Sequence, residues 1–83
     1  MSMVFFTYRS GTAARNGLDI LRREAVSARM DRTPAQLTRF GCGYGLWVPP
    51  HQSKRAAALL REHGADYERC YRMSRNGFQE VTL

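Results

Sequence analysis

Short apolar runs and longer stretches with helical spacing alternate along this chain. Residues 3–8 form an apolar, aromatic run of strand length, and residues 9–12 have the composition of a turn. In that turn, the hydroxyl of Ser10 or Thr12 can cap a following helix. Apolar residues then recur at the spacing of one helical face, at Ala14, Leu18, Leu21 and Ala25. The pattern predicts a strand followed by a helix.

A second strand, a loop and a third strand are expected next. Residues 26–31 alternate like a short strand, which Pro34 ends. Residues 33–43 have no sustained period and are predicted to form a loop. Residues 44–48 are a compact apolar strand that stops at Pro49. These two strands are predicted to flank this loop.

The last part of the chain predicts a second helix and two more strands. Pro50 suits the first turn of this helix, and Gly64 fits its left-handed C-terminal cap. Its apolar face carries Ala56, Leu59, Leu60 and His63. Residues 67–73 alternate and predict a fourth strand. Asn76-Gly77 indicates a type I′ hairpin turn, so residues 78–83 are expected to add a fifth strand at the sheet edge.

The predicted elements follow the order βαββαβ, with two halves of similar length. With right-handed crossovers, this order predicts a ferredoxin-like α+β fold, in which a four-stranded antiparallel sheet carries both helices on one face. We expect residues 1–75 to form this single domain and residues 76–83 to extend it as a hairpin or edge strand. A chain of 83 residues falls within the single-domain range, and its core is thin.

Apolar side chains also alternate onto the sheet face that the helices leave uncovered. Phe5 in the first strand and Trp47 in the third are expected to point outward there. Such a face either binds a partner or is covered by another copy of the protein. Because a small domain with a thin core gains from association, the sequence predicts a homo-oligomer.

The chain is basic, and its basic residues are almost all arginines. Thirteen basic and seven acidic side chains leave a net charge of +6, and Lys54 is the only lysine. Arginine binds planar anions through a fixed fork of donors, so an anionic partner such as nucleic acid is allowed. A soluble basic surface explains the same composition. A hydrophobic content of 43% excludes a disordered tail.

The cysteine and histidine content argues against a metal site. Cys42 and Cys70 are the only cysteines, they do not form a CxxC pair, and His51 and His63 are the only histidines. We therefore expect no metal and no cofactor. The N-terminal apolar run is too short for a signal peptide or a membrane span. The expected compartment is the cytoplasm, where thiols stay reduced, and no membrane partner is expected.

The Gly41-Cys42-Gly43 motif is the candidate for chemistry. Two glycines leave the thiol unshielded, and their backbone amides, with Arg39 nearby in sequence, could hold an anion and favour the thiolate. His51 could activate the thiol if the fold brings it to the loop. The alternative is that Cys42 is a small buried apolar residue and the glycines serve a turn.

Two other residues with reactive side chains are predicted to be structural. Cys70 lies in the middle of a predicted strand, where a single cysteine is usually a packing residue. His63 is expected on the apolar face of the second helix, near the C-terminal end that favours a cation. The acidic residues are scattered among arginines and give no carboxylate pair for acid–base catalysis.

The third predicted strand shares three residues with the RNA-recognition motif. That motif reads K/R-G-F/Y-G/A-F-V-x-F/Y, and only Gly43, Tyr44 and Gly45 match it here. Cys42, Leu46 and Pro49 stand where the motif has its basic residue and two aromatic residues. RNA binding by Tyr44 and Phe5 on an open sheet therefore remains an alternative function.

A larger part of the chain, about residues 4–73, resembles the small bacterial selenium/sulfur carrier protein-like domains, formerly a domain of unknown function. The resemblance rests on a strand that ends near Ser10, a helix over residues 14–25, Pro34 with Leu37 and Thr38, and the pair Cys42-Gly43. Arg32 stands where the family usually has a further proline. The resemblance implies that Cys42 accepts sulfane sulfur or selenium and carries it as a persulfide or selenopersulfide.

Three functions therefore stand beside one another. The first is a thiol carrier, at most sulfurtransferase-like as an enzyme, with donor and acceptor proteins or small thiols as partners. The second is an RNA-binding module, and the third is a self-assembling interaction domain. Thiol reactivity separates the first from the third, and salt-dependent RNA binding separates the second from both.

Overall fold

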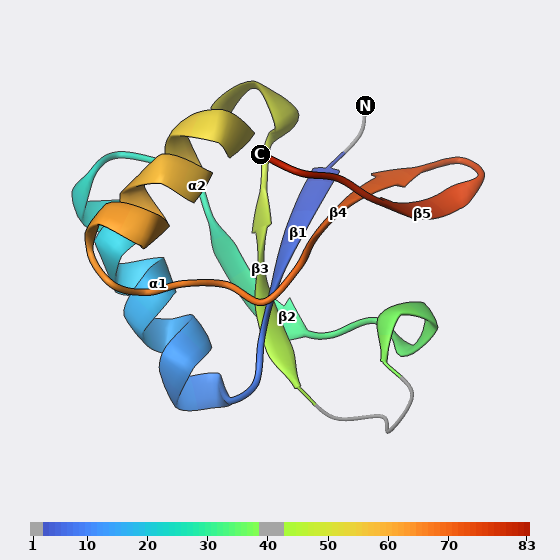
Figure 1. Ribbon diagram of the computed structural model, residues 1–83, viewed down its shortest axis with the longest axis horizontal. Helices are drawn as coiled ribbons and strands as arrows, with labels where there is room; N and C mark the ends of the chain where they lie inside the picture. Colours follow the sequence, from blue (N-terminus) through green and yellow to red (C-terminus); the bar gives the residue numbers. More distant parts are fainter. Residues whose placement is uncertain (1–2, 39–42) are drawn as a thin grey trace.

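The computed structural model describes residues 3–38 and 43–83, which form a five-stranded antiparallel sheet with two helices on one face (Figure 1). The sheet order is β2-β3-β1-β4-β5, with β1 at the centre. The strands are β1 (Met3–Tyr8), β2 (Arg29–Arg32), β3 (Tyr44–Val48), β4 (Cys70–Ser74) and β5 (Gly77–Glu80). The helices are α1 (Gly11–Arg23) and α2 (Ser53–Glu62), and two short 3-10 turns are η1 (Ala35–Leu37) and η2 (Pro50–Gln52). The predicted α+β class is confirmed, and the fifth strand is part of the same sheet.

Both ends of α1 follow from local sequence. The Ser10 hydroxyl accepts a hydrogen bond from the Ala13 N–H at 3.1 Å, which confirms Ser10 as the N-cap. At the other end, the N–H of Val26 donates to the Leu21 carbonyl at 2.9 Å, and Ala25 has a φ of 59°. These features form a Schellman cap, in which the left-handed position is occupied by alanine rather than glycine.

The predicted second strand begins too early in the sequence. Residues 26–31 were expected, but β2 covers Arg29–Arg32. Val26 belongs to the cap of α1 and its side chain is buried in the core, so the chain becomes extended only beyond it. Within the predicted loop over residues 33–43, the 3-10 turn η1 forms at Ala35–Leu37. The predicted third strand, β3, is confirmed over Tyr44–Val48.

The second helix and the hairpin also differ from the prediction in detail. Gly64 caps α2 with a φ of 72°, as expected, but His63 is exposed and not part of the apolar face. The hairpin pairs Ser74 with Gly77, and Gly77 has a φ of 108°. A type I′ turn needs positive φ at both central residues. Among the described residues other than glycine, only Ala25 has positive φ, so the predicted type I′ turn is wrong.

The predicted fourth strand is shortened at its start. It was expected over residues 67–73, and β4 begins at Cys70. The segment just before β4 is irregular because of the Thr7 side chain. The Thr7 hydroxyl accepts a hydrogen bond from the Arg69 N–H at 3.0 Å, in place of a backbone carbonyl. The segment still follows β1, since the Glu68 N–H donates to the Thr7 carbonyl at 2.8 Å.

The main core lies between the sheet and the two helices. Val4, Phe6 and Leu46 supply its sheet side, and helix residues such as Leu21 and Leu60 supply the other. This arrangement follows from strand alternation meeting helical spacing. The buried Tyr8 hydroxyl also donates to the Ala65 carbonyl at 2.5 Å, which links β1 to the chain that leaves α2.

The opposite face of the sheet is covered within the chain. Phe5 and Trp47 do lie on that face, but their exposed fractions are 0% and 7%, so the expectation that they point into solvent is wrong. Their rings pack at a centroid distance of 4.7 Å, and Trp47 also lies 6.2 Å from the Phe78 ring. The Trp47 indole N–H donates to Asp31 at 3.2 Å. Phe5 fits because Gly45 beneath it has no side chain, and a Cβ there would lie 2.5 Å from ring carbons of Phe5.

Candidate functional site

The loop between β2 and β3 is closed at its base by a backbone hydrogen bond. The Thr33 N–H donates to the Gly43 carbonyl at 3.1 Å. Gly43 has a φ of 120°, a conformation that favours glycine, and a Cβ on it would lie 3.3 Å from the Thr33 hydroxyl oxygen. Both the positive φ and the closeness of Thr33 therefore favour glycine at position 43 of the predicted motif.

Three of the predicted site residues, Arg39, Gly41 and Cys42, lie outside the described residues. The described residues on either side are Thr38, which follows η1, and Gly43, which precedes β3.

The base of this loop lies at the same end of the sheet as the N-terminus of α1. Tyr44 pairs with Tyr8 in β1 and with Arg32 in β2, and α1 begins three residues after Tyr8. The Tyr44 ring lies against the first residue of α1, where a Cβ on Gly11 would be 3.5 Å from its ring carbons. The first turn of α1 contains no acidic residue, so the partial positive charge of the helix end is not neutralised within that turn.

His51 lies beyond the other end of β3. It belongs to η2, which follows the C-terminal residue of β3, and its side chain is exposed. Gly43 precedes the first residue of the same strand. A five-residue strand is about 16 Å long, so the structure does not bring His51 to the base of the loop.

Cys70 is a packing residue, as predicted. Its exposed fraction is 2%, and it belongs to the main core. Burial raises the pKa of the Cys70 thiol to about 11, an effect that Arg72 partly opposes. A thiol that is buried and protonated at neutral pH is a poor nucleophile.

A family comparison adds to this geometry. A family model described as “Putative Se/S carrier protein-like” matches residues 3–72. The chain belongs to this family. The resemblance that rests on Pro34 and Cys42-Gly43 is confirmed at the level of the family. No curated protein and no solved structure matches the chain.

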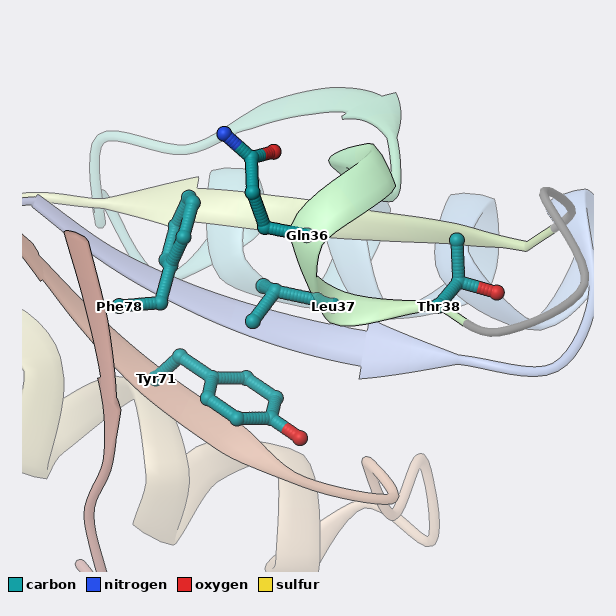
Figure 2. A pocket seen from close by; sticks show the side chains of 5 residues that line it. All are labelled: Gln36, Leu37, Thr38, Tyr71 and Phe78. Atoms are coloured by element: carbon teal, nitrogen blue, oxygen red, sulfur yellow. The ribbon is translucent and has the colours of Figure 1, made fainter.

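In this family member, a pocket of about 390 Å³ opens on the sheet face away from the helices. Figure 2 shows Leu37 between η1 and the sheet, with Tyr71 of β4 and Phe78 of β5 facing it. Gln36 and Thr38 also line the pocket. Sequence reasoning missed this pocket because the loop over residues 33–43 had no periodicity, although the alternation of Tyr71 and Phe78 in adjacent strands could have indicated their shared face.

The structure does not place the two residues proposed to stack on RNA bases on an open surface. Phe5 has no exposed surface and cannot stack on a base. Tyr44 lies on the helix side of the sheet, packed against the main core. The hypothesis that these two rings form an open stacking surface is wrong, because Phe5 is covered and Tyr44 faces the other way.

Among residues 3–38 and 43–83, no group of three His, Cys, Asp or Glu side chains is placed to hold a metal ion. No helix in the same residues is long and apolar enough to cross a membrane.

Proposed function

We propose that this protein is a sulfur or selenium carrier and that Cys42 is the residue that accepts the cargo. Membership of the Se/S carrier family is the observation that carries the proposal. The sequence contains two cysteines, and because Cys70 is buried in the core, we assign the exchange to Cys42. We also infer that the first four strands and the two helices form a ferredoxin-like unit, which β5 extends.

The base of the loop that carries Cys42 has two features that stabilise a nearby thiolate. The N-terminus of α1 lies at this end of the sheet, and Arg32 pairs in register with Tyr44. A helix N-terminus and a nearby cation both lower the pKa of a thiol. Gly41 and Gly43, which flank Cys42 in the sequence, have no side chains, and Arg39 adds a positive charge nearby in the sequence.

The proposed exchange needs no cofactor. The Cys42 thiolate attacks the terminal sulfur of a donor persulfide, a new S–S bond forms at Cys42, and the donor's S–S bond breaks. The donor leaves as a thiolate, which takes up a proton, so no outside oxidant is consumed. Selenium follows the same course when the terminal atom of the donor is selenium. A second thiol or an acceptor protein then takes the terminal atom in a nucleophilic step, which returns Cys42 to its thiolate.

The pocket on the sheet face away from the helices is our proposed contact for the donor or acceptor. Gln36, Leu37 and Thr38 line it and belong to the segment of residues 33–43 that carries Cys42. Among the described residues that line it, none has a charged side chain, which suits an apolar or aromatic group of the partner with few hydrogen-bonding atoms.

Persulfide loading tests this function directly. The purified chain is incubated with a small-molecule persulfide donor, and intact mass and peptide mapping locate the added sulfur. We expect loading of the wild type on Cys42, loss of loading in Cys42→Ser, and normal loading in Cys70→Ala. Loading that survives in Cys42→Ser, or none in the wild type, would overturn the proposal.

A further inference from the structure

The sheet has two edge strands, β2 and β5, whose outer edges differ in their protection. An edge strand presents unpaired backbone N–H and C=O groups, and soluble proteins usually protect such edges with charged side chains or local caps. In residues 3–38 and 43–83, no strand pairs with the outer edge of either strand. Figure 1 shows the β4–β5 hairpin at the margin of the fold, away from both helices.

The β2 edge is protected. The Thr33 N–H donates to the Gly43 carbonyl, toward β3. Because backbone groups along a strand point alternately to its two sides, those of Met30 and Arg32 point outward. The Asp31 carboxylate accepts from the outward Arg32 N–H at 2.8 Å and covers it. Charged residues at three of the four β2 positions protect the edge further.

The β5 edge is less protected than the β2 edge. The N–H of Val81 donates to the Cys70 carbonyl at 2.9 Å, so the backbone groups of Phe78 and Glu80 alternate to the outer side. The strand contains no Lys, Arg or Pro. Its one charged side chain, Glu80, pairs with Arg69 of the same chain at 3.2 Å. The charge of Glu80 is therefore balanced within its own chain, and it gives the outer edge of β5 little protection against pairing.

We propose that β5 pairs with β5 of a second copy of this chain, so that two sheets join into one across a two-fold axis. In antiparallel register, Phe78 of one copy stands opposite the partner's Glu80, and Glu80 opposite the partner's Phe78. This register uses the outward N–H and C=O groups of both residues in both copies.

The side chains of β5 fit this register. Gln79 stands opposite the partner's Gln79 at the two-fold axis, and it is exposed in one copy. Two amides that meet in this way can each donate to and accept from the other. Glu80 meets a phenyl ring instead of a second carboxylate, so no like charges face each other directly. The β2 edge offers no such register without displacing Asp31 from the Arg32 N–H.

Amide resonances measured over a dilution series test the pairing at individual residues. We expect the N–H signals of Phe78 and Glu80 to move with concentration as the copies separate. The N–H signals of Met30 and Arg32 in β2 are the internal control and should stay in place. Movement confined to β2, or a protein that sediments as a monomer up to about 1 mM, a range in which weak complexes are still populated, would overturn the proposal.

A charge-swap pair tests the contact at the axis. Gln79→Lys and Gln79→Glu each place like charges opposite one another, so each alone should weaken dimerisation at least tenfold in sedimentation. An equal mixture should dimerise again, because opposite charges then meet. Asn16→Lys, which adds the same charge on the exposed face of α1, should dimerise like the wild type. A dimer that Gln79→Lys leaves unchanged, or a mixture no stronger than either variant, would mean that β5 is not the interface.

Discussion

Thr33 and Gly43 join the two ends of the loop that carries Cys42. The N–H of Thr33 lies 3.1 Å from the Gly43 carbonyl oxygen, and Gly43 has a φ of 120°. The proposed nucleophile directly precedes a residue whose backbone conformation strongly favours glycine. The Cys-Gly pair of the family thus has a structural reason in this chain: the glycine allows the strand pair to close beside the cysteine.

Replacing Gly43 with alanine should affect both stability and thiol chemistry. A side chain at this φ is strained, so we expect the free energy of unfolding to fall by about 1–3 kcal/mol. Persulfide loading of Cys42 should also slow. Gly77→Ala is the matched control, because Gly77 has a similar φ of 108° but lies in the β4–β5 turn. Denaturant unfolding and loading rates measure the two effects. If Gly77→Ala slows loading as much as Gly43→Ala, the effect comes from general destabilisation.

The two cysteines should differ in their rates of alkylation. We expect a small alkylating agent at neutral pH to modify Cys42 well before Cys70, because Cys70 is buried and its pKa is raised to about 11. Peptide mapping after a brief exposure measures both sites in one sample. In denaturant the two rates should converge. Equal labelling of the folded protein, or faster labelling of Cys70, would contradict the assignment of Cys42 as the carrier residue.

Stability should fall at alkaline pH. Burial raises the pKa of Cys70 from 9.0 to about 11, so the unfolded chain loses this proton first as the pH rises. The stability that Cys70 contributes is present below pH 9 and is lost between pH 9 and about 11, on the order of 2–3 kcal/mol. Burial also raises the pKa of Tyr8 above its ordinary 10.0, which adds to the loss at the upper end of this window.

Variants at Cys70 and Tyr8 separate the contributions of the two side chains to this loss of stability. Unfolding measured from pH 7 to 11 should decline less steeply in Cys70→Ala, although that variant starts from a lower stability because its core loses the sulfur. Tyr8→Phe should flatten the decline above pH 10. An unchanged slope in both variants would place the alkaline sensitivity elsewhere in the chain.

The two helix caps predict opposite effects of exchanging alanine and glycine. Ala25 after α1 and Gly64 after α2 both have positive φ, of 59° and 72°. Alanine is strained in this region, so Ala25→Gly should stabilise the fold by about 0.5–1 kcal/mol and Gly64→Ala should destabilise it by about 1 kcal/mol. Thermal or denaturant unfolding measures both. A loss of stability in Ala25→Gly would mean that glycine's flexibility in the unfolded chain outweighs the relief of strain.

The sequence by itself determined the elements that depend on local pattern. Ser10 capped a helix, alternation placed β1 and β3, and Gly64 ended α2, because each signal acts over a few neighbouring residues. It also determined the family, since Pro34 and Cys42-Gly43 are read directly from the chain. Alternation even placed Phe5 and Trp47 on the correct face.

Only the tertiary structure decided what covers that face and which residues meet at the loop. Phe5 is buried because Gly45 leaves room for its ring and residues distant in sequence pack around it. His51 and Gly43 lie at opposite ends of β3, a separation that sequence spacing did not reveal. Burial and proximity depend on contacts between distant segments, and a periodic pattern specifies the face of an element but not the partner that the face meets.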